Sequence, residues 1–289
     1  VRPNVFLPET YRGTTFIKKN LLAAAFARAV AVPGVVAADA SFYGSLKPRI
    51  QVQDSNITFK DGASRIGWKS STDMGNGNSV SGKVELGLDM SDGHINTADT
   101  SRVTTVSFGG DWGSATLGSQ CSVMTGPDWV TCVNSGSSCA GHVGYQGRLS
   151  DSLVLSGPAV GPLGLSIQME ADGSDLAAWA IATGLDLGSI NIQAAYRDTD
   201  SDEYTEVAAS TTVAGMTLAA GFSDSGSGSD GSSIFANISG LKLQYDETGG
   251  DADLSANYDV DLGGATMRLG VVDNEGSETK VFVQWMYNL

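Results

Sequence analysis

Charged and amide side chains recur at every second position along many stretches of this chain. Between residues 41 and 53, for example, Lys47 and Arg49 alternate with Leu46 and Ile50. Successive side chains of a β-strand point to opposite faces of a sheet, so each such strand has one polar and one apolar face. Ionised groups that line a water-filled passage attract or repel ions, and this is the chemistry that the pattern offers.

The polar face of these runs carries most of the candidate functional residues. The charged candidates on it are Lys47, Arg49, Arg65, Lys69, Lys83, Glu85, Asp89, Arg148, Glu170, Arg197, Lys242, Asp246 and Arg268, with Gln168 and Gln193 among the amides. So many charges could not line the dry core of a soluble barrel, because a buried charge without a partner is costly. The alternating apolar residues, such as Leu86 and Leu88, suit contact with lipid. The pattern therefore favours a barrel with a hydrated interior and an apolar exterior.

Other kinds of chemistry find little support in the sequence. The two histidines, His94 and His142, have no nucleophile motif beside them, so we expect no enzyme. The run from 198 to 203 is rich in oxygen ligands of the kind that Ca²⁺ prefers. Its carboxylates are those of Asp198, Asp200, Asp202 and Glu203. This run either holds Ca²⁺ in an external loop or is an ordinary solvated loop, and no other cofactor is expected.

The three cysteines do not have the spacing of a zinc site. Cys132 and Cys139 bracket a flexible polar segment, and in an oxidising compartment these two could form a disulfide and leave Cys121 over. The alternative is that all three are unpaired small residues.

The net charge argues against one class of partner. The chain carries 17 basic and 32 acidic residues, a net charge of −15. The first 38 residues hold five of the basic residues and one acid, so residues 39–289 carry 12 basic against 31 acidic residues, or −19. Nucleic acid is not an expected partner, because phosphate binding needs a basic surface. The acidity either serves solubility or forms a vestibule that attracts cations.

The N-terminal region resembles an export signal. Lys18 and Lys19 precede an apolar stretch that ends in the small residues 35–37. We expect cleavage near Ala37 or Ala38, so that residues 1–37 comprise an upstream extension and a signal peptide, and residues 38–289 form the barrel. A short amphipathic helix is the alternative for the apolar stretch.

After Asp39, about sixteen short alternating runs follow one another. Their approximate spans are 41–53, 63–74, 79–90, 102–110, 115–124, 141–155, 163–171, 176–187, 189–199, 203–214, 216–225, 232–239, 241–247, 252–262, 265–273 and 278–289. Tight glycine-rich turns, such as 75–78 and 263–264, alternate with longer polar connectors, such as 53–62 and 126–141. Short turns at one rim and longer loops at the other are typical of a transmembrane antiparallel β-barrel of the outer membrane, and this all-β fold class is our prediction.

Three segments resemble Gram-negative general porins, especially those of the neisserial and β-proteobacterial type. They are 39–47, which is similar to the mature start of that family, and the hairpins 64–85 and 102–118. The resemblance covers about residues 39–126 and extends to the alternating C-terminal strand. It implies a homotrimer of 16-stranded barrels that contacts outer-membrane lipid and lipopolysaccharide and passes ions and small hydrophilic solutes by passive diffusion.

The resemblance also implies a constriction. The third loop of such porins folds into the lumen, and here it would span about 124–141, with Asp128 and the possible Cys132–Cys139 bridge. Its acids would face the basic residues of the wall. Thr116 and Ser119 stand where the family tends to place arginine, so we expect weak cation selectivity. The alternatives are a channel specific for sugar or phosphate and a structural or adhesive barrel.

Overall fold

The computed structural model describes residues 39–95, 102–132, 147–173 and 175–289, and the predicted signal peptide lies outside them. No helix among these residues is long and apolar enough to cross a membrane. The described elements in chain order are β1 (Asp39–Leu46), β2 (Pro48–Gln53), β3 (Asn56–Asp61), β4 (Ser64–Gly75), β5 (Asn78–Asp89), β6 (His94–Ile95), β7 (Val103–Gly110), β8 (Gly113–Cys121), α2 (Thr125–Thr131), β9 (Arg148–Ser156), β10 (Leu163–Asp172), β11 (Asp175–Asp186), β12 (Ile190–Thr199), β13 (Glu203–Val213), β14 (Met216–Ser225), β15 (Asp230–Ile238), β16 (Leu241–Thr248), β17 (Asp251–Asp261), β18 (Thr266–Asn274) and β19 (Lys280–Asn288).

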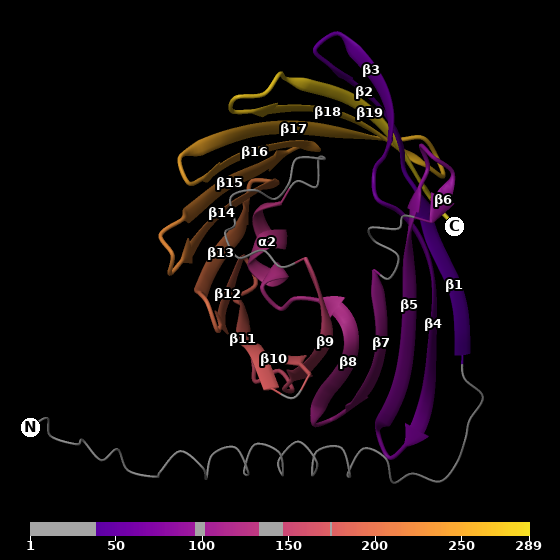
Figure 1. Ribbon diagram of the computed structural model, residues 1–289, viewed down its shortest axis with the longest axis vertical. Coiled ribbons are helices and arrows are strands. Elements are labelled where there is room, and N and C mark those ends of the chain that lie inside the picture. Colours follow the sequence, from indigo (N-terminus) through magenta and orange to yellow (C-terminus); the bar gives the residue numbers. More distant parts are fainter. Residues whose placement is uncertain (1–38, 96–101, 133–146, 174) are drawn as a thin grey trace, which may run out of the picture.

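All the strands belong to one antiparallel sheet that closes on itself (Figure 1). The ends of the chain complete the closure, because Ser45 of β1 pairs with Asn288 of β19 and Val52 of β2 pairs with Val281 of the same strand. Closure follows from the surroundings, since lipid offers no hydrogen bonds to the backbone groups of an open sheet edge.

The barrel itself has sixteen strands, which confirms the predicted fold class. The labels are more numerous because β1 and β2 are two parts of the first barrel strand, divided at Lys47, and β3 and β4 are two parts of the second. The second break lies at Gly62 and Ala63, where Ala63 has a φ of 69°. β6 is a two-residue strand that pairs with the end of β5.

One predicted connector was wrong. Residues 53–62, expected as a polar loop, form the hairpin of β2 with β3. Asp54 and Ser55 have φ values of 48° and 59°, and positive φ at both central residues suits the tight turns that match the twist of paired strands. The prediction failed because Asp and Ser also mark loops, and because Ile57 and Phe59 are separated from the preceding run by this turn.

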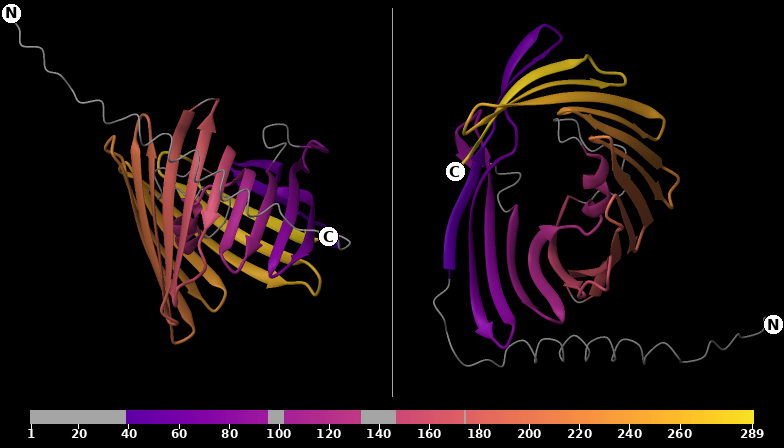
Figure 2. Two further views of the ribbon diagram at one scale, coloured as in Figure 1. Left: turned by 90° about the horizontal axis from the view of Figure 1, so that it is seen from below. Right: turned by 180° about the vertical axis from the view of Figure 1, so that it is seen from behind.

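The inner face of the sheet can be followed around the barrel by its register, because residues directly opposite each other on paired strands share a face. Helix α2 lies inside the barrel (Figures 1 and 2), and the Thr131 hydroxyl at its end contacts Ser233 of β15 at 2.9 Å. Ser233 pairs with Asp246 of β16, and further along the sheet Asn257, Gly270 and Phe282 follow on the same face. The inner face is therefore polar over much of its area.

The outer face has the opposite character. Trp68 of β4 is 51% exposed and Leu165 of β10 is 45% exposed, and both point away from the interior. Amides such as Gln168 and Gln244 are buried on the inside instead. A soluble protein has the reverse distribution, so the alternation serves a lipid-facing exterior.

Candidate functional site in the barrel lumen

The inner surface has two contrasting regions. We call the inner face of β1, β2, β4, β5 and β17–β19, together with Arg102, the basic wall. We call the inner face of β10 and β12–β15, against which α2 lies, the helix wall. Sheet order places β18, β19, β1, β2, β4 and β5 next to one another, so the cations of the basic wall gather from residues far apart in the sequence.

Glu85 lies at the centre of the basic wall. Its side chain is almost fully buried, with 4% exposure of the residue. Arg102 donates from Nε to its carboxylate at 2.9 Å, and Tyr43 donates its hydroxyl proton at 3.0 Å. Arg65 and Lys83 lie 3.6 and 3.7 Å from the same carboxylate. A buried carboxylate is stable only when it is paired and hydrogen-bonded, and these groups meet that need.

The register explains how Tyr43 reaches this carboxylate. Tyr43 is opposite Gly67, and Gly67 is opposite Glu85 on the next strand. A Cβ atom on residue 67 would lie 2.6 Å from the Tyr43 ring, so glycine leaves the space across which the ring lies. Lys69 and Lys83 are directly opposite each other, and their ammonium groups lie 5.9 and 5.6 Å from the ring centre. The ring face attracts both cations and offsets part of their repulsion.

A second acid neutralises the other end of the basic wall. Asp259 of β17 accepts two hydrogen bonds from Arg268, at 2.6 and 2.8 Å, and one from Lys242 at 3.0 Å. Arg49 donates from Nε to Gln284 at 2.9 Å and stacks over the Phe282 ring at 4.4 Å. These contacts fix the guanidinium groups, because a planar fork held by two partners has little freedom.

Helix α2 is held to the helix wall by polar contacts along its length. The Val123 amide, just before the helix, donates to Gln168 Oε1 at 2.8 Å, and the Thr131 hydroxyl meets Ser233 at the other end. Gly126 approaches β12 so closely that a Cβ atom there would lie 2.9 Å from Gln193 Oε1. The loop that begins after β8 therefore folds inward and narrows the lumen.

Asp128 of α2 faces the helix wall rather than the open lumen. The residue is 1% exposed, and Glu206 of β13, against which the helix packs, has no measurable exposure. Burial raises the pKa of the Asp128 carboxyl to about 8, because the charged form loses its hydration. Cys132, just after the helix, is disulfide-bonded, and Cys121 is a free thiol. The predicted partner Cys139 lies outside the described residues, so that pairing stays a prediction.

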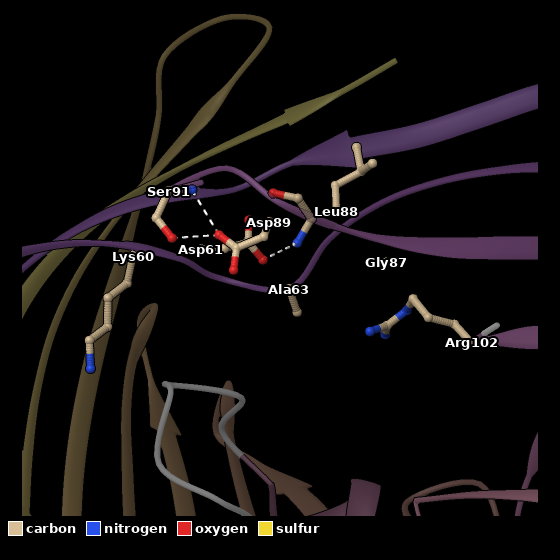
Figure 3. Close-up of a pocket in the computed structure, with 9 residues that line it drawn as sticks. Lys60, Asp61, Ala63, Gly87, Leu88, Asp89, Ser91 and Arg102 are labelled. Atoms are coloured by element: carbon tan, nitrogen blue, oxygen red, sulfur yellow. Dashed lines mark hydrogen bonds between the residues drawn. The ribbon is translucent and has the colours of Figure 1, made fainter. Parts of the chain in front are cut away.

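A small polar cavity of about 410 Å³ lies between the ends of β4 and β5, beside the basic wall (Figure 3). Arg102 reaches toward it from one side, and Asp61 and Asp89 lie on the other. Both acids are occupied locally: Asp61 accepts from the Ser64 amide at 2.8 Å and Asp89 from the Ser91 amide at 2.9 Å. Asp89 therefore lies at the rim of the barrel and not in the basic wall.

The predicted calcium run does not form a cluster of ligands in the described residues. Asp198 accepts a hydrogen bond from Trp179 Nε1 at 3.1 Å, and Asp202 caps the Glu203 amide at 3.0 Å. Within the described ranges, the side chains close enough to share an ion are those of Asp89, Asp92 and His94, whose ligand atoms lie within 4.8 Å of one another. They are solvent-accessible groups of a rim loop.

Comparison with known proteins decides the family. A model of the Gram-negative porin family matches residues 23–289, which is most of the chain. The chain belongs to the Gram-negative porin family. The porin is accordingly a diffusion channel of the outer membrane of Gram-negative bacteria and not an enzyme. No curated protein matches its sequence.

Solved structures show the same fold at low sequence identity. OmpF of Salmonella typhi in complex with daunomycin has a TM-score of 0.70 at 14% identity, over 89% of this chain and 100% of that one. An anion-selective porin from Comamonas acidovorans has a TM-score of 0.68 at 14% identity, over 88% and 100% of the two chains. The trimer form of OmpT from Vibrio cholerae has the same values. At this identity the likeness shows the fold alone.

The lumen of the porin brings together some predicted residues and separates others. Arg65, Lys69, Lys83 and Glu85 meet around Tyr43, and Lys47 lies within electrostatic reach of Arg65, Arg102 and Arg268. Arg148 begins β9 opposite Cys121, away from this cluster. The sequence pattern did not identify Arg102, Glu206 and Asp259 as functional residues, although all three take part in the arrangement of charges inside the barrel. Alternation within β17 marks Asp259 as polar. Arg102 precedes its strand and Glu206 lies in a strand with weak alternation. The sequence pattern therefore does not identify either of these two residues as inward-facing.

Proposed function

We propose that this porin is a general pore for ions and small hydrophilic solutes, with a weak preference for cations. The observation that carries the proposal is the position of Glu85 and Asp259 within the basic wall. Each acid is bonded to two or more of the surrounding cations, so the wall presents much less positive charge to the lumen than its sequence suggests. Weak selectivity is expected when opposite charges alternate so closely along a pore wall.

Acidic residues at the mouth of the pore favour the entry of cations over that of anions. Asp246, Asp251, Asp253 and Glu275 line a cavity of about 360 Å³ where β16, β17 and β18 meet their loops. A group of carboxylates in a hollow raises the local concentration of cations and lowers that of anions. The net charge of −19 over residues 39–289 acts in the same direction.

A channel specific for phosphate or another anion is the second candidate, because Lys69 and Lys83 stand together in the basic wall beside Tyr43. The Lys83 side chain is 43% exposed, so its ammonium group remains accessible to an anion in the lumen. The anion-selective neighbour from Comamonas acidovorans shares only the fold, and its selectivity is a property of that protein. A sugar channel has less support, since few aromatic residues face the lumen of the described barrel.

The remaining expectations about this porin are part of the same proposal. It forms a homotrimer embedded in outer-membrane lipid and lipopolysaccharide, as porins typically do. It belongs to the neisserial and β-proteobacterial type, a proposal that is supported by the resemblance of residues 39–126. Export would use the predicted signal peptide, with cleavage near Ala37 or Ala38.

A planar-bilayer recording of the purified porin tests the proposal. We expect an ohmic conductance that does not saturate with sugar or phosphate, and a reversal potential in a KCl gradient that lies slightly on the cation side. Saturation by phosphate with clear anion preference would support the second candidate. A correctly folded barrel that carries no current would instead favour a structural or adhesive role.

A further inference from the structure

Two cations on the inner face of the barrel have no acidic partner. Arg49 of β2 lies directly opposite Lys60 of β3, and the same row of the sheet continues through Gln284 and Arg268. At one end of the row, Arg268 is bonded to Asp259. At the other end, no carboxylate of the described residues lies within 4 Å of the Arg49 or the Lys60 side chain. The row therefore ends in two positive charges that are not neutralised by contact.

Asp61 is the acid that follows Lys60 in the chain, and it forms no ion pair with either cation. It lies opposite Pro48, one position from the Arg49–Lys60 pair, so its side chain leaves the strand on the other face. Its carboxylate accepts a hydrogen bond from the Ser64 amide at 2.8 Å and acts on Arg49 only through space. Lys60 points away from Asp61 (Figure 3). Like charges directly opposite each other on neighbouring strands repel, and an anion bound between them removes that cost.

Arg49 is held in place by neutral groups. Its Nε and Nη2 atoms donate to Gln284 Oε1 at 2.9 and 2.5 Å, and its guanidinium carbon lies 4.4 Å from the centre of the Phe282 ring. Both supporting side chains are buried, and the Phe282 ring lies over Gly270, where a Cβ atom would overlap it. In the part of the chain that the structure describes, Nη1 donates to no acceptor. Because a fixed guanidinium loses little freedom on binding, its free edge is prepared for an oxyanion.

We propose that Arg49 and Lys60 form a binding site for small dicarboxylates between the mouth of the pore and the acid Glu85. One carboxylate binds the free edge of the planar Arg49 guanidinium, because the N–H groups of that edge match the two oxygens of a carboxylate. The other carboxylate binds the Lys60 ammonium. Lys60 is exposed, so its flexible stem adjusts to the length of the solute.

The site rests on the proposed pore function and deepens it. Tyr43, which donates to Glu85, lies six residues before Arg49 in the first barrel strand, a separation of about 20 Å at about 3.3 Å per residue. The site is therefore separate from the cations around Glu85. Acids at the mouth repel anions, so an anionic solute enters a pore with a weak preference for cations slowly. Two uncompensated cations below the mouth retain such a solute and favour its passage without making the pore selective for anions.

Saturation-transfer NMR of the full-length porin in detergent tests binding directly. The probe is succinate, and its uncharged diamide, succinamide, is the control ligand. Lys60→Gln and Arg49→Gln each remove one charge of the site. Lys280→Gln removes a cation that faces the lumen and is bonded to Asn274, and it is the matched control. We expect the dissociation constant for succinate to be unchanged in the control and about tenfold higher in the other two variants, which corresponds to about 1.4 kcal/mol.

Three results of the NMR titration would overturn the site. The first is equal affinity for succinate in the wild type and in Lys60→Gln, a variant that should fold normally because the side chain is exposed. The second is equal transfer to succinamide and to succinate, which would show that charge plays no part. The third is displacement of succinate by an equal concentration of inorganic phosphate, since a single tetrahedral oxyanion would then fit as well as a dicarboxylate.

A current measurement separates the site from the pore function. Bound succinate neutralises both cations, so its addition on both sides of the membrane should shift the reversal potential in a KCl gradient toward the cation side. We expect this shift in the wild type and in Lys280→Gln, and a smaller one in Lys60→Gln. A wild type that conducts and shows no shift would overturn the site and leave the pore function intact. A wild type without any current would contradict the pore function, and the NMR titration then decides the site alone.

Discussion

Buried ionisable side chains have different surroundings in the basic wall and in the helix wall. In the basic wall, Arg65, Lys83 and Arg102 surround Glu85, so that each of these four charges has a partner of opposite sign within 4 Å. In the helix wall, Asp128 and Glu206 are buried together under α2, and the nearby Arg197 is already paired with Glu170. Opposite charges therefore compensate one another in the basic wall, whereas burial in the helix wall raises the pKa of Asp128.

The largest expected effect is the loss of a buried partner in the basic wall. Arg102→Gln leaves the Glu85 carboxylate with Arg65 and Lys83 at longer distances, so we expect a loss of about 3–5 kcal/mol in the free energy of unfolding. Urea unfolding in detergent measures this loss. Arg65→Gln is the matched control, and we expect it to cost less because the Arg65 side chain is partly exposed. Equal losses in both variants would show that Glu85 does not depend on the buried contact.

A steric change at Gly67 tests whether the Tyr43 ring lies where it contacts the basic wall. Gly67→Ala places a methyl group 2.6 Å from the Tyr43 ring, so the ring must move away from Glu85 and the two lysines. Overpacking of this kind costs about 1–3 kcal/mol. Gly82→Ala on the outer face, where the nearest atom lies 3.5 Å away, is the control and should be close to neutral. Thermal unfolding of the two variants compares them, and identical midpoints would contradict the position of Tyr43.

A smaller effect is expected at the helix wall. Thr131→Val removes the hydroxyl that meets Ser233 and keeps the shape of the side chain, so the docking of α2 weakens by about 1 kcal/mol. The population of docked helix then falls, and open-channel noise should increase while the stability of the barrel changes little. Trp129→Phe, at an exposed position on the same helix, is the control. Noise that is the same in Thr131→Val and in the control would show that this contact does not hold the helix.

The smallest effect is expected outside both walls. Asp200→Asn lies in the run 198–203, the candidate calcium site, where Asp198 already accepts a hydrogen bond from Trp179. We expect a change below about 0.5 kcal/mol in stability, with or without Ca²⁺, as for most surface substitutions. Differential scanning calorimetry with Ca²⁺ and with EDTA checks this. A melting temperature that rises with Ca²⁺ in the wild type alone would establish a calcium site in this loop.

Much of the barrel could be predicted from the sequence because its signal is local. The period of two in 251–261 or 190–199 marks both the strand and its polar face, whatever the strand pairs with. Helix α2 gives no such signal, since seven residues that include Gly126 and Pro127 have low helix propensity and the helix exists because it packs on the wall.

The arrangement of charges could be predicted only in part. Alternation marks Glu85 and Lys83 as inward-facing, but their approach to Arg102 depends on the register among three segments, which no local pattern contains. The sequence pattern does not identify Glu206, because its strand is rich in alanine, serine and threonine, which give little difference in polarity between the two faces. Sequence therefore predicts which face a residue occupies more readily than which partner it meets.

We propose that Glu85 neutralises the basic wall and so sets the ion preference of the pore. Reversal potentials of the wild type and Glu85→Gln in the same KCl gradient test it most directly, with Glu247→Gln, an exposed acid bonded to Tyr245, as the control. We predict a potential slightly on the cation side for the wild type and the control, and a clear shift to the anion side for Glu85→Gln. A wild type that already prefers anions strongly, or a Glu85→Gln pore with an unchanged reversal potential, would contradict this role of Glu85.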